Sequence, residues 1–226
     1  MIQEARLLEK QCWNCTTTTD DHFCTSCQCI QLLDLSTNYF SFFKLPIKFH
    51  LDLNKLENKF YELSRKFHPD FFSQASEQER RYSNEHTSML NDAYRTLKDP
   101  IKRANYFLTL QGFKAIGQNT KTPPDLLAEI FELNEQIEEL RDAKRNKDNA
   151  QINLLKTQVL AIEKMLKQRA NELNSQLSKH FSDWDNLFDT IPIGERQTLL
   201  NKISDILSQI KYINNLLNNI EEEFDE

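Results

Sequence analysis

The chain has 226 residues, enough for one large domain or two small ones, and a formal net charge of -6. It contains only three glycines and six prolines, too few turn residues for a strand-rich protein of this length, so we expect an all-α fold. The negative charge disfavours a nucleic-acid binder, and no apolar run approaches the roughly 18 residues that span a bilayer. We therefore expect a soluble, intracellular protein without a nucleic-acid or membrane partner.

The N-terminal region, residues 1–36, is set apart because all five cysteines lie between positions 12 and 29. Four of them form two pairs, Cys12-x-x-Cys15 and Cys24-x-x-Cys27, separated by eight residues. Each pair places two thiolates on one side of a tight loop, and two such loops complete a tetrahedral metal site. Zinc is the expected occupant, with iron its usual substitute. The alternative is disulfides or free thiols, and an intracellular setting disfavours disulfides.

A site closed by four cysteines leaves no open position for a substrate, so we expect a structural metal. Cys29 is a fifth thiol that could compete as a ligand. We expect His22 to be a loop residue, and Trp13 and Phe23 to form a small apolar floor for this module. Metal-binding knuckles often carry glycine directly after the second cysteine, whereas here these two positions hold Thr16 and Gln28.

The second region, residues 37–113, begins with a predicted amphipathic helix. Apolar residues at steps of three and four form one stripe of this helix, namely Leu53, Leu56, Phe60, Leu63 and Phe67. Asp52 is the expected N-cap, and Pro69 should end the helix because it disfavours α geometry at His68.

Two further helices are predicted in this region from their end signals. Ser76 and Glu79 fit a capping box that opens the next helix. Asp99 then caps a short helix that has Pro100 at its first position, and Gly112 stops it.

The tripeptide His68-Pro69-Asp70 lies between the first two of these helices. An HPD tripeptide alone is weak evidence, but here a basic amphipathic helix precedes it and a longer capped helix follows. On the polar side of the preceding helix we expect three solvated cations, Lys59, Arg65 and Lys66. The alternative is a helix-ending proline beside an ordinary charged surface.

The third region, residues 124–226, contains three long amphipathic stripes. They comprise Leu126, Ile130, Leu133, Ile137 and Leu140; then Leu155, Ile162, Leu166, Ala170, Leu173 and Leu177; then Leu199, Ile203, Ile206, Ile210, Ile213, Leu217 and Ile220. Helices of this kind cannot hide their apolar stripes individually, so we expect a three-helix bundle. Pro192 and Gly194 should interrupt the chain at the start of the last helix.

The stretch from Lys59 to Leu108, which contains the HPD tripeptide, resembles a J-domain. Several segments are similar to the HscB family, co-chaperones of iron–sulfur cluster assembly: YFSFFKLP at 39–46, LDLNKL at 51–56, LNDAYRTLKDPIKRANYFLTLQG at 90–112 and LLAEIFELNEQIEEL at 126–140. Members of that family with a four-cysteine N-terminal module also match CWNC and FCTSCQCIQ. The resemblance therefore covers nearly the whole chain, in the family's order.

This resemblance implies a contact with an ATPase chaperone of the DnaK/HscA class, whose ATP hydrolysis the contact promotes. The residues implied in the contact are Arg65, Lys66, His68, Pro69 and Asp70. A carboxylate beside a rigid proline turn offers an oriented acceptor to a cationic partner surface. J-domains generally continue the tripeptide with a basic residue, whereas Phe71 stands here.

The resemblance also implies that the first helix of the C-terminal bundle binds an IscU-type iron–sulfur scaffold. The matching positions are Leu127, Ala128, Phe131, Glu132 and Glu135. Three of them, Leu127, Phe131 and Glu135, follow at steps of four, which places them on one strip of the helix beside the core stripe. The alternative is that Phe131 packs inside the bundle.

We therefore expect a co-chaperone that delivers the scaffold to its ATPase partner and is not itself an enzyme. No phosphate-binding glycine loop and no nucleophile or paired-carboxylate site can be placed on these helices. The residues before the first cysteine resemble neither a signal peptide nor a transit sequence, so we expect the cytoplasm in a bacterium and the mitochondrial matrix in a eukaryote. The alternatives are a general J-protein with another client and a zinc-finger nucleic-acid binder.

Overall fold

The computed structural model describes residues 10–19, 21–113, 127–187 and 192–225. In these ranges the chain is helical and contains no β-sheet, which confirms the expected all-α fold. Isolated backbone bridges join Gln11 to Thr18 and Phe23 to Ile30. None of the described helices is long and apolar enough to cross a membrane. The chain divides into two compact units, residues 1–103 and 104–226.

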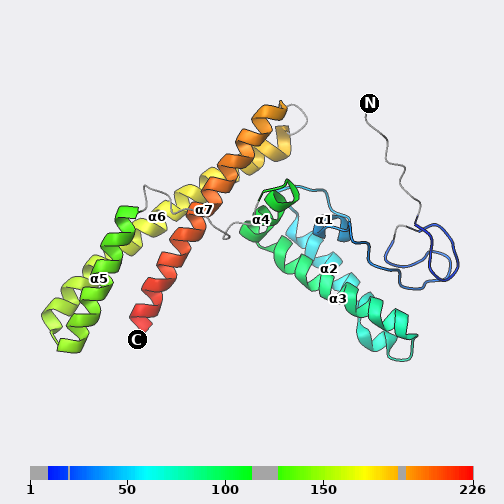
Figure 1. Ribbon diagram of the computed structural model, residues 1–226, viewed down its shortest axis with the longest axis horizontal. Helices are drawn as coiled ribbons and strands as arrows, with labels where there is room; N and C mark the ends of the chain where they lie inside the picture. The colour runs from blue at the N-terminus through cyan, green and yellow to red at the C-terminus, as the bar shows by residue number, and fades with distance from the viewer. Residues whose placement is uncertain (1–9, 20, 114–126, 188–191, 226) are drawn as a thin grey trace. The chain divides into compact units, whose positions relative to one another are not determined.

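The first unit contains the cysteine loops followed by a helical hairpin (Figure 1). Its elements are helix α1 (Tyr39–Phe42), helix α2 (Leu53–Phe67), the 3-10 helix η1 (Pro69–Phe72) and helix α3 (Glu77–Lys98). The expected caps are confirmed, because Asp52 accepts a hydrogen bond from the Lys55 amide at 3.0 Å and Ser76 forms a capping box with Glu79. The HPD tripeptide lies at the turn of the hairpin.

The hairpin buries two of the five residues in the predicted stripe of α2 and half-buries Phe60 and Leu63. Leu56 and Phe67 are fully buried, whereas Leu53, the first residue of the helix, is exposed. The expectation that Leu53 is buried with the rest of the stripe was wrong. The spacing of apolar residues shows which face of a helix is apolar, but it does not show how far along that face another helix packs. Lys59 was also expected to be solvated, but its ammonium donates to the backbone carbonyls of Phe43 and Lys44. Burial there lowers the pKa of Lys59.

Helix α4 (Pro100–Leu110) begins and ends as its sequence signals predict. The Asp99 carboxylate accepts hydrogen bonds from the amides of Ile101 and Lys102 at 2.8 and 2.9 Å. Gly112 has a φ of 85°, a left-handed conformation that favours glycine, and its amide bonds the Thr109 carbonyl at 3.0 Å.

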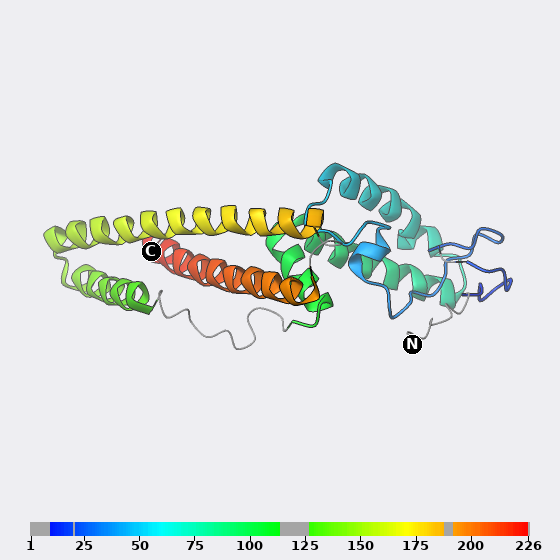
Figure 2. The same ribbon diagram turned by 90° about the horizontal axis from the view of Figure 1, so that it is seen from above.

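The second unit is built mainly from three long helices, α5 (Leu127–Asn146), α6 (Asn149–Leu187) and α7 (Ile193–Asp225). Helices α6 and α7 run side by side along most of their lengths, and α5 lies beside the first part of α6 (Figure 2). The buried residues include Leu133, Ile137, Leu140, Leu155, Ile162, Leu166, Leu173, Leu177, Ile203, Ile206, Ile210, Ile213 and Ile220. This confirms most of the three predicted stripes. In the third stripe Leu199 and Leu217 are only half-buried, and their neighbours Leu200 and Leu216 are buried instead. Leu126 and the side chain of Ile130 lie outside the described residues.

One buried carboxylate joins the C-terminal parts of α5 and α7. The Glu223 side chain, near the end of α7, is 2% exposed and lies 2.7 Å from Nε of Arg141 and 3.0 Å from Nζ of Lys144. Lys144 also donates to the Glu223 backbone carbonyl at 2.9 Å. Burial alone would raise the pKa of Glu223, but these two α5 cations outweigh it and hold the pKa below its usual range.

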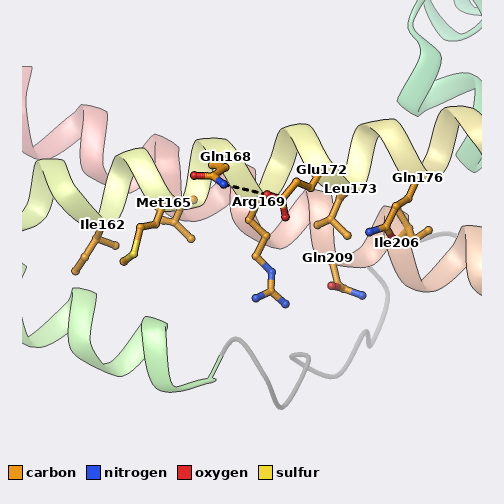
Figure 3. A pocket seen from close by; sticks show the side chains of 10 residues that line it. Ile162, Met165, Gln168, Arg169, Glu172, Leu173, Gln176, Ile206 and Gln209 are labelled. Atoms are coloured by element: carbon orange, nitrogen blue, oxygen red, sulfur yellow. Dashed lines mark hydrogen bonds between the residues drawn. The ribbon is translucent and has the colours of Figure 1, made fainter.

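Because α5 is much shorter than α6, it covers only part of the α6–α7 pair. Beyond the first residues of α5 the pair is hollowed by a groove of about 540 Å³, shown in Figure 3. Most of its lining comes from α6, including Ile162, Met165, Arg169 and Leu173, while Ile206 and Gln209 come from α7.

Candidate functional site

The HPD tripeptide forms an ordered turn in which the histidine caps the residues that follow it. His68 leaves the helix with φ -57° and ψ 124°, and Pro69 then opens η1. Nδ1 of His68 accepts a hydrogen bond from the Asp70 amide at 3.3 Å. The Asp70 side chain is 88% exposed, and its Oδ2 lies 3.5 Å from Nδ1 of His68. The turn therefore presents an oriented carboxylate to solvent.

The end of α2 is anchored by hydroxyl groups from α3. The carbonyl of Phe67 accepts hydrogen bonds from Oγ of Ser83 at 2.7 Å and from Oγ1 of Thr87 at 3.1 Å. Carbonyls in the last turn of a helix have no partner within the helix, so these bonds fix the point from which the HPD turn departs. Sequence reasoning missed both residues, although hydroxyls four positions apart on one face of α3 were a visible signal.

The two predicted basic residues lie on the last turn of α2, next to the HPD turn. Arg65 and Lys66 are both exposed, and Lys66 pairs with Glu62 at 2.6 Å. Cations at this end of a helix are favoured by its dipole. Phe71 is exposed as well, with its ring centroid 6.2 Å from that of His68. All five predicted chaperone-contact residues are therefore exposed, on either side of the buried Phe67.

The four paired cysteines converge as their spacing predicts. The Sγ atoms of Cys12, Cys15, Cys24 and Cys27 all lie within 4.8 Å of one another. Two of the separations, Cys12 to Cys27 and Cys15 to Cys24, are 3.6 Å. A disulfide requires about 2.05 Å, whereas a tetrahedron with metal–sulfur bonds of 2.3 Å has edges of about 3.8 Å. The donor set therefore fits one metal ion with four thiolate ligands.

The two cysteine loops have the same backbone geometry. The amides of Asn14 and Ser26 each point at the first sulfur of their own pair, at 3.4 Å. Thr16 and Gln28 have φ values of 60° and 61°, in the left-handed region where glycine is favoured. This explains why glycine is common at these two positions in metal knuckles.

The fifth cysteine does not join the group of four. Cys29 accepts a hydrogen bond from the Asn14 side-chain amide at 3.3 Å, and burial raises its pKa to about 11. The backbone amide of Cys29 instead helps to lower the pKa of Cys27 to about 6. Geometry separates Cys29 from the ligand set, because the group of sulfurs within 4.8 Å of one another comprises Cys12, Cys15, Cys24 and Cys27.

The aromatic residues of the cysteine module were expected to line its own floor, and that prediction was wrong for Phe23. Its ring stacks on Phe67 of α2, with centroids 5.6 Å apart and planes 16° from parallel. Trp13 lies at the rim, with its Nε1 donating to the Ile30 carbonyl at 2.7 Å and its ring 6.2 Å from Tyr82. A module this small cannot bury its aromatic side chains alone, so they pack on the neighbouring hairpin.

His22 is more than the loop residue that the sequence suggested. Its ring centroid lies 4.7 Å from Phe42, 5.2 Å from Phe67 and 5.3 Å from His86. Its Nε2 donates to the Phe42 carbonyl at 3.0 Å. Burial lowers the pKa of His22 and lowers that of His86 to about 4. Burial therefore disfavours the charged form of both rings, which belong to one aromatic cluster.

The predicted scaffold-binding positions lie at the start of α5. Phe131 is 71% exposed, and Glu132 and Glu135 are exposed beside it. Phe131 therefore does not pack inside the bundle, because Leu133 and Ile137 occupy the core side of this helix. Leu127 and Ala128 open the helix, but their side chains lie outside the part of the chain that the structure describes.

Two family models match consecutive parts of the chain. Residues 39–106 match the DnaJ domain, and residues 122–221 match the HSCB C-terminal oligomerisation domain. The helical hairpin carries an exposed HPD turn, and the same residues match the DnaJ domain. These two findings define a J-domain protein.

The second match and the relatives identify the family. Human iron-sulfur cluster co-chaperone protein HscB is 30% identical over 213 residues, which cover 91% of this chain and 79% of that protein. The mouse protein of the same name is 39% identical, but the alignment covers 56% of this chain and 57% of that protein. The crystal structure of the human protein matches with a TM-score of 0.69 at 28% identity, covering 95% of this chain and 98% of that one. The chain belongs to the HscB family of iron–sulfur cluster co-chaperones.

Proposed function

We propose that this chain stimulates the ATPase of a DnaK/HscA-class chaperone and delivers an IscU-type scaffold to it. The single observation that carries the proposal is the HPD turn, which exposes Asp70 at the end of a helix whose last carbonyl is anchored. In this proposal residues 1–36 form the metal module, 37–113 the J-domain and 124–226 the scaffold-binding bundle. The site of action is the cytoplasm in a bacterium and the mitochondrial matrix in a eukaryote.

The chaperone contact needs no catalytic group on this chain. Arg65 and Lys66 extend from the last turn of α2, and Asp70 adds a carboxylate whose direction is set by Pro69 and by the His68 cap. Charge-assisted hydrogen bonds from a cationic partner surface to such a carboxylate are strong and directional. The work of ATP hydrolysis is then done by residues of the partner.

The scaffold contact is proposed for the exposed strip formed by Phe131, Glu132 and Glu135, together with Leu127 and Ala128. A large aromatic side chain that is mostly exposed on an isolated chain is a typical energetic centre of a protein interface. The two carboxylates beside it favour a partner with a basic surface and suppress wrong partners of like charge.

We propose zinc as the metal of the tetracysteine site. Zn²⁺ prefers a closed tetrahedral set of four thiolates, and when bound it would hold the two cysteine loops in one shape. Elemental analysis of protein purified without chelator should find about one zinc per chain. Cys24→Ser should reduce this well below one, and wild-type protein without a metal would contradict the assignment.

The ATPase activity of a purified DnaK/HscA-class partner tests the main proposal. Wild-type protein should raise the rate of hydrolysis, and Asp70→Asn should leave it at the basal rate, because the substitution removes the charge but keeps the size. Asp92→Asn is a matched control, since Asp92 is a half-exposed carboxylate on α3 that pairs with Arg95. Equal stimulation by the wild type and Asp70→Asn would remove the HPD turn from the mechanism.

A further inference from the structure

Phe67, the last residue of α2, is held in place by the cysteine module as well as by the hairpin. It is fully buried and directly precedes His68 in the chain. Phe23 stacks on one side of its ring, and His22 and His86 contact it with centroids 5.2 and 4.8 Å away. The residue from which the HPD turn departs is therefore partly packed by a loop that holds metal ligands.

The module is held by short-range loop hydrogen bonds and by a few contacts to the hairpin, such as the hydrogen bond from Nε2 of His22 to the Phe42 carbonyl at 3.0 Å. Its described residues contain no helix, and its isolated bridges join Gln11 to Thr18 and Phe23 to Ile30. Without a cross-link, the entropy of so short and irregular a loop opposes a single conformation. Phe23 is bonded directly to Cys24, so a metal bound by the four cysteines fixes the loop where it meets α2.

We propose that Phe23 is a positioning residue for the HPD turn, and that metal bound to the tetracysteine site holds it against Phe67. Metal occupancy then stabilises the last turn of α2 and the geometry of the tripeptide. The packing part of this inference stands on the contacts above. Its effect on a chaperone's ATPase rests on the proposed function of the HPD turn.

Such a coupling has to act in both directions. If metal favours the contact between Phe23 and Phe67, then that contact must favour metal binding by the same factor. A variant that loses the stacked rings should therefore release zinc to a competing chelator more readily, although all four cysteines are intact.

Hydrogen exchange on the full chain, with and without Zn²⁺, tests the inference without any partner. In the wild type, removal of zinc should speed exchange of the amides of residues 64–68 about three- to tenfold, the effect of losing one aromatic pair. Amides around Ala93 in α3 should not change. In Phe23→Leu, which keeps an apolar side chain, exchange at residues 64–68 should already be fast with zinc bound and respond little to its removal.

Leu35→Ala serves as the matched control, because Leu35 is a fully exposed apolar residue of the same N-terminal segment. This variant should respond to zinc as the wild type does. If zinc removal exposes the module amides but leaves residues 64–68 unchanged in the wild type, the inference is wrong. It is equally wrong if Phe23→Leu shows the full wild-type response, since the coupling would then not pass through this ring.

Stimulation of a chaperone's ATPase tests the effect of Phe23 on function. Zinc-loaded Phe23→Leu should stimulate less than the wild type at subsaturating concentration, while Leu35→Ala should not differ. If the wild type stimulates no DnaK/HscA-class partner, the proposed function is wrong. The inference about Phe23 is then tested by the hydrogen-exchange result alone.

Discussion

The ring of Phe23 stacks on the ring of Phe67, at a centroid distance of 5.6 Å and an angle of 16°. The first residue adjoins a predicted metal ligand, and the second adjoins the histidine of the HPD turn. Two motifs that are separate in the sequence therefore share one hydrophobic contact. This relationship makes the cysteine module part of the packing of the J-domain.

The exposed strip of α5 should affect scaffold binding without affecting stability. Phe131→Ala should change the free energy of unfolding by less than about 0.5 kcal/mol, because the side chain is mostly solvated. It should weaken binding of an IscU-type scaffold about tenfold or more, as expected when an aromatic hot-spot residue of an interface is truncated. Isothermal titration calorimetry with the purified scaffold measures this.

Leu154→Ala is the control for that prediction, because Leu154 is an exposed apolar residue of α6 in the same bundle. Its scaffold affinity should equal that of the wild type. Unchanged affinity in Phe131→Ala, or an equal loss in both variants, would contradict the assignment of the strip.

The left-handed conformation of Gln28 should make glycine stabilising at this position. Gln28→Gly should remove the steric cost of a φ of 61°, which is about 1 kcal/mol. We expect the variant to retain zinc against a competing chelator several-fold longer. Gln28→Ala also loses the hydrogen bond from the Gln28 side chain to the Thr25 carbonyl, but it keeps the strain, so it should show no gain. If Gln28→Gly and Gln28→Ala retain zinc equally well, then the left-handed backbone conformation at position 28 does not weaken zinc binding.

The buried carboxylate of the bundle should contribute measurably to its stability. Glu223→Gln removes the charge that Arg141 and Lys144 neutralise, and it should lower the free energy of unfolding by about 1–2 kcal/mol. The loss stays below that of a fully buried pair because Arg141 remains half exposed and is screened by solvent. Urea unfolding followed by helical circular dichroism measures this. Glu222→Gln, at the exposed neighbouring position, should leave stability unchanged.

Buried His86 should make the first unit less stable in acid. Its pKa falls from an ordinary value near 6.5 to about 4, chiefly through burial. Between these values the unfolded chain binds a proton that the folded chain does not. The contribution of His86 is therefore fully present above pH 6.5 and decreases by roughly 3 kcal/mol as the pH falls to 4.

Urea unfolding between pH 7 and pH 4.5 checks this effect. The zinc-free wild type should lose more stability over this range than zinc-free His86→Phe, which keeps an aromatic ring in the cluster. Parallel curves for the two proteins would show that His86 does not titrate differently on unfolding.

Much of the local architecture could be predicted from residue spacing and helix-end signals. Asp52, Ser76 and Asp99 cap the helices where the sequence places them, and the four paired cysteines converge. These predictions were correct because each one concerns residues that are close together in the chain or a local motif that occurs twice. The side chains of Leu53 and Lys59 were misjudged because their surroundings depend on neighbouring elements.

Local spacing thus specifies the helices, the ligand set of the metal site and the HPD turn, since each follows from backbone geometry over a few residues. It does not specify that Phe23 packs on Phe67, that Ser83 and Thr87 bond the Phe67 carbonyl, or that Glu223 meets the cations of α5. In each of these cases the partners are far apart in the chain. Their contact depends on how the completed helices and loops pack together to exclude water. The residues of one short segment do not specify that packing.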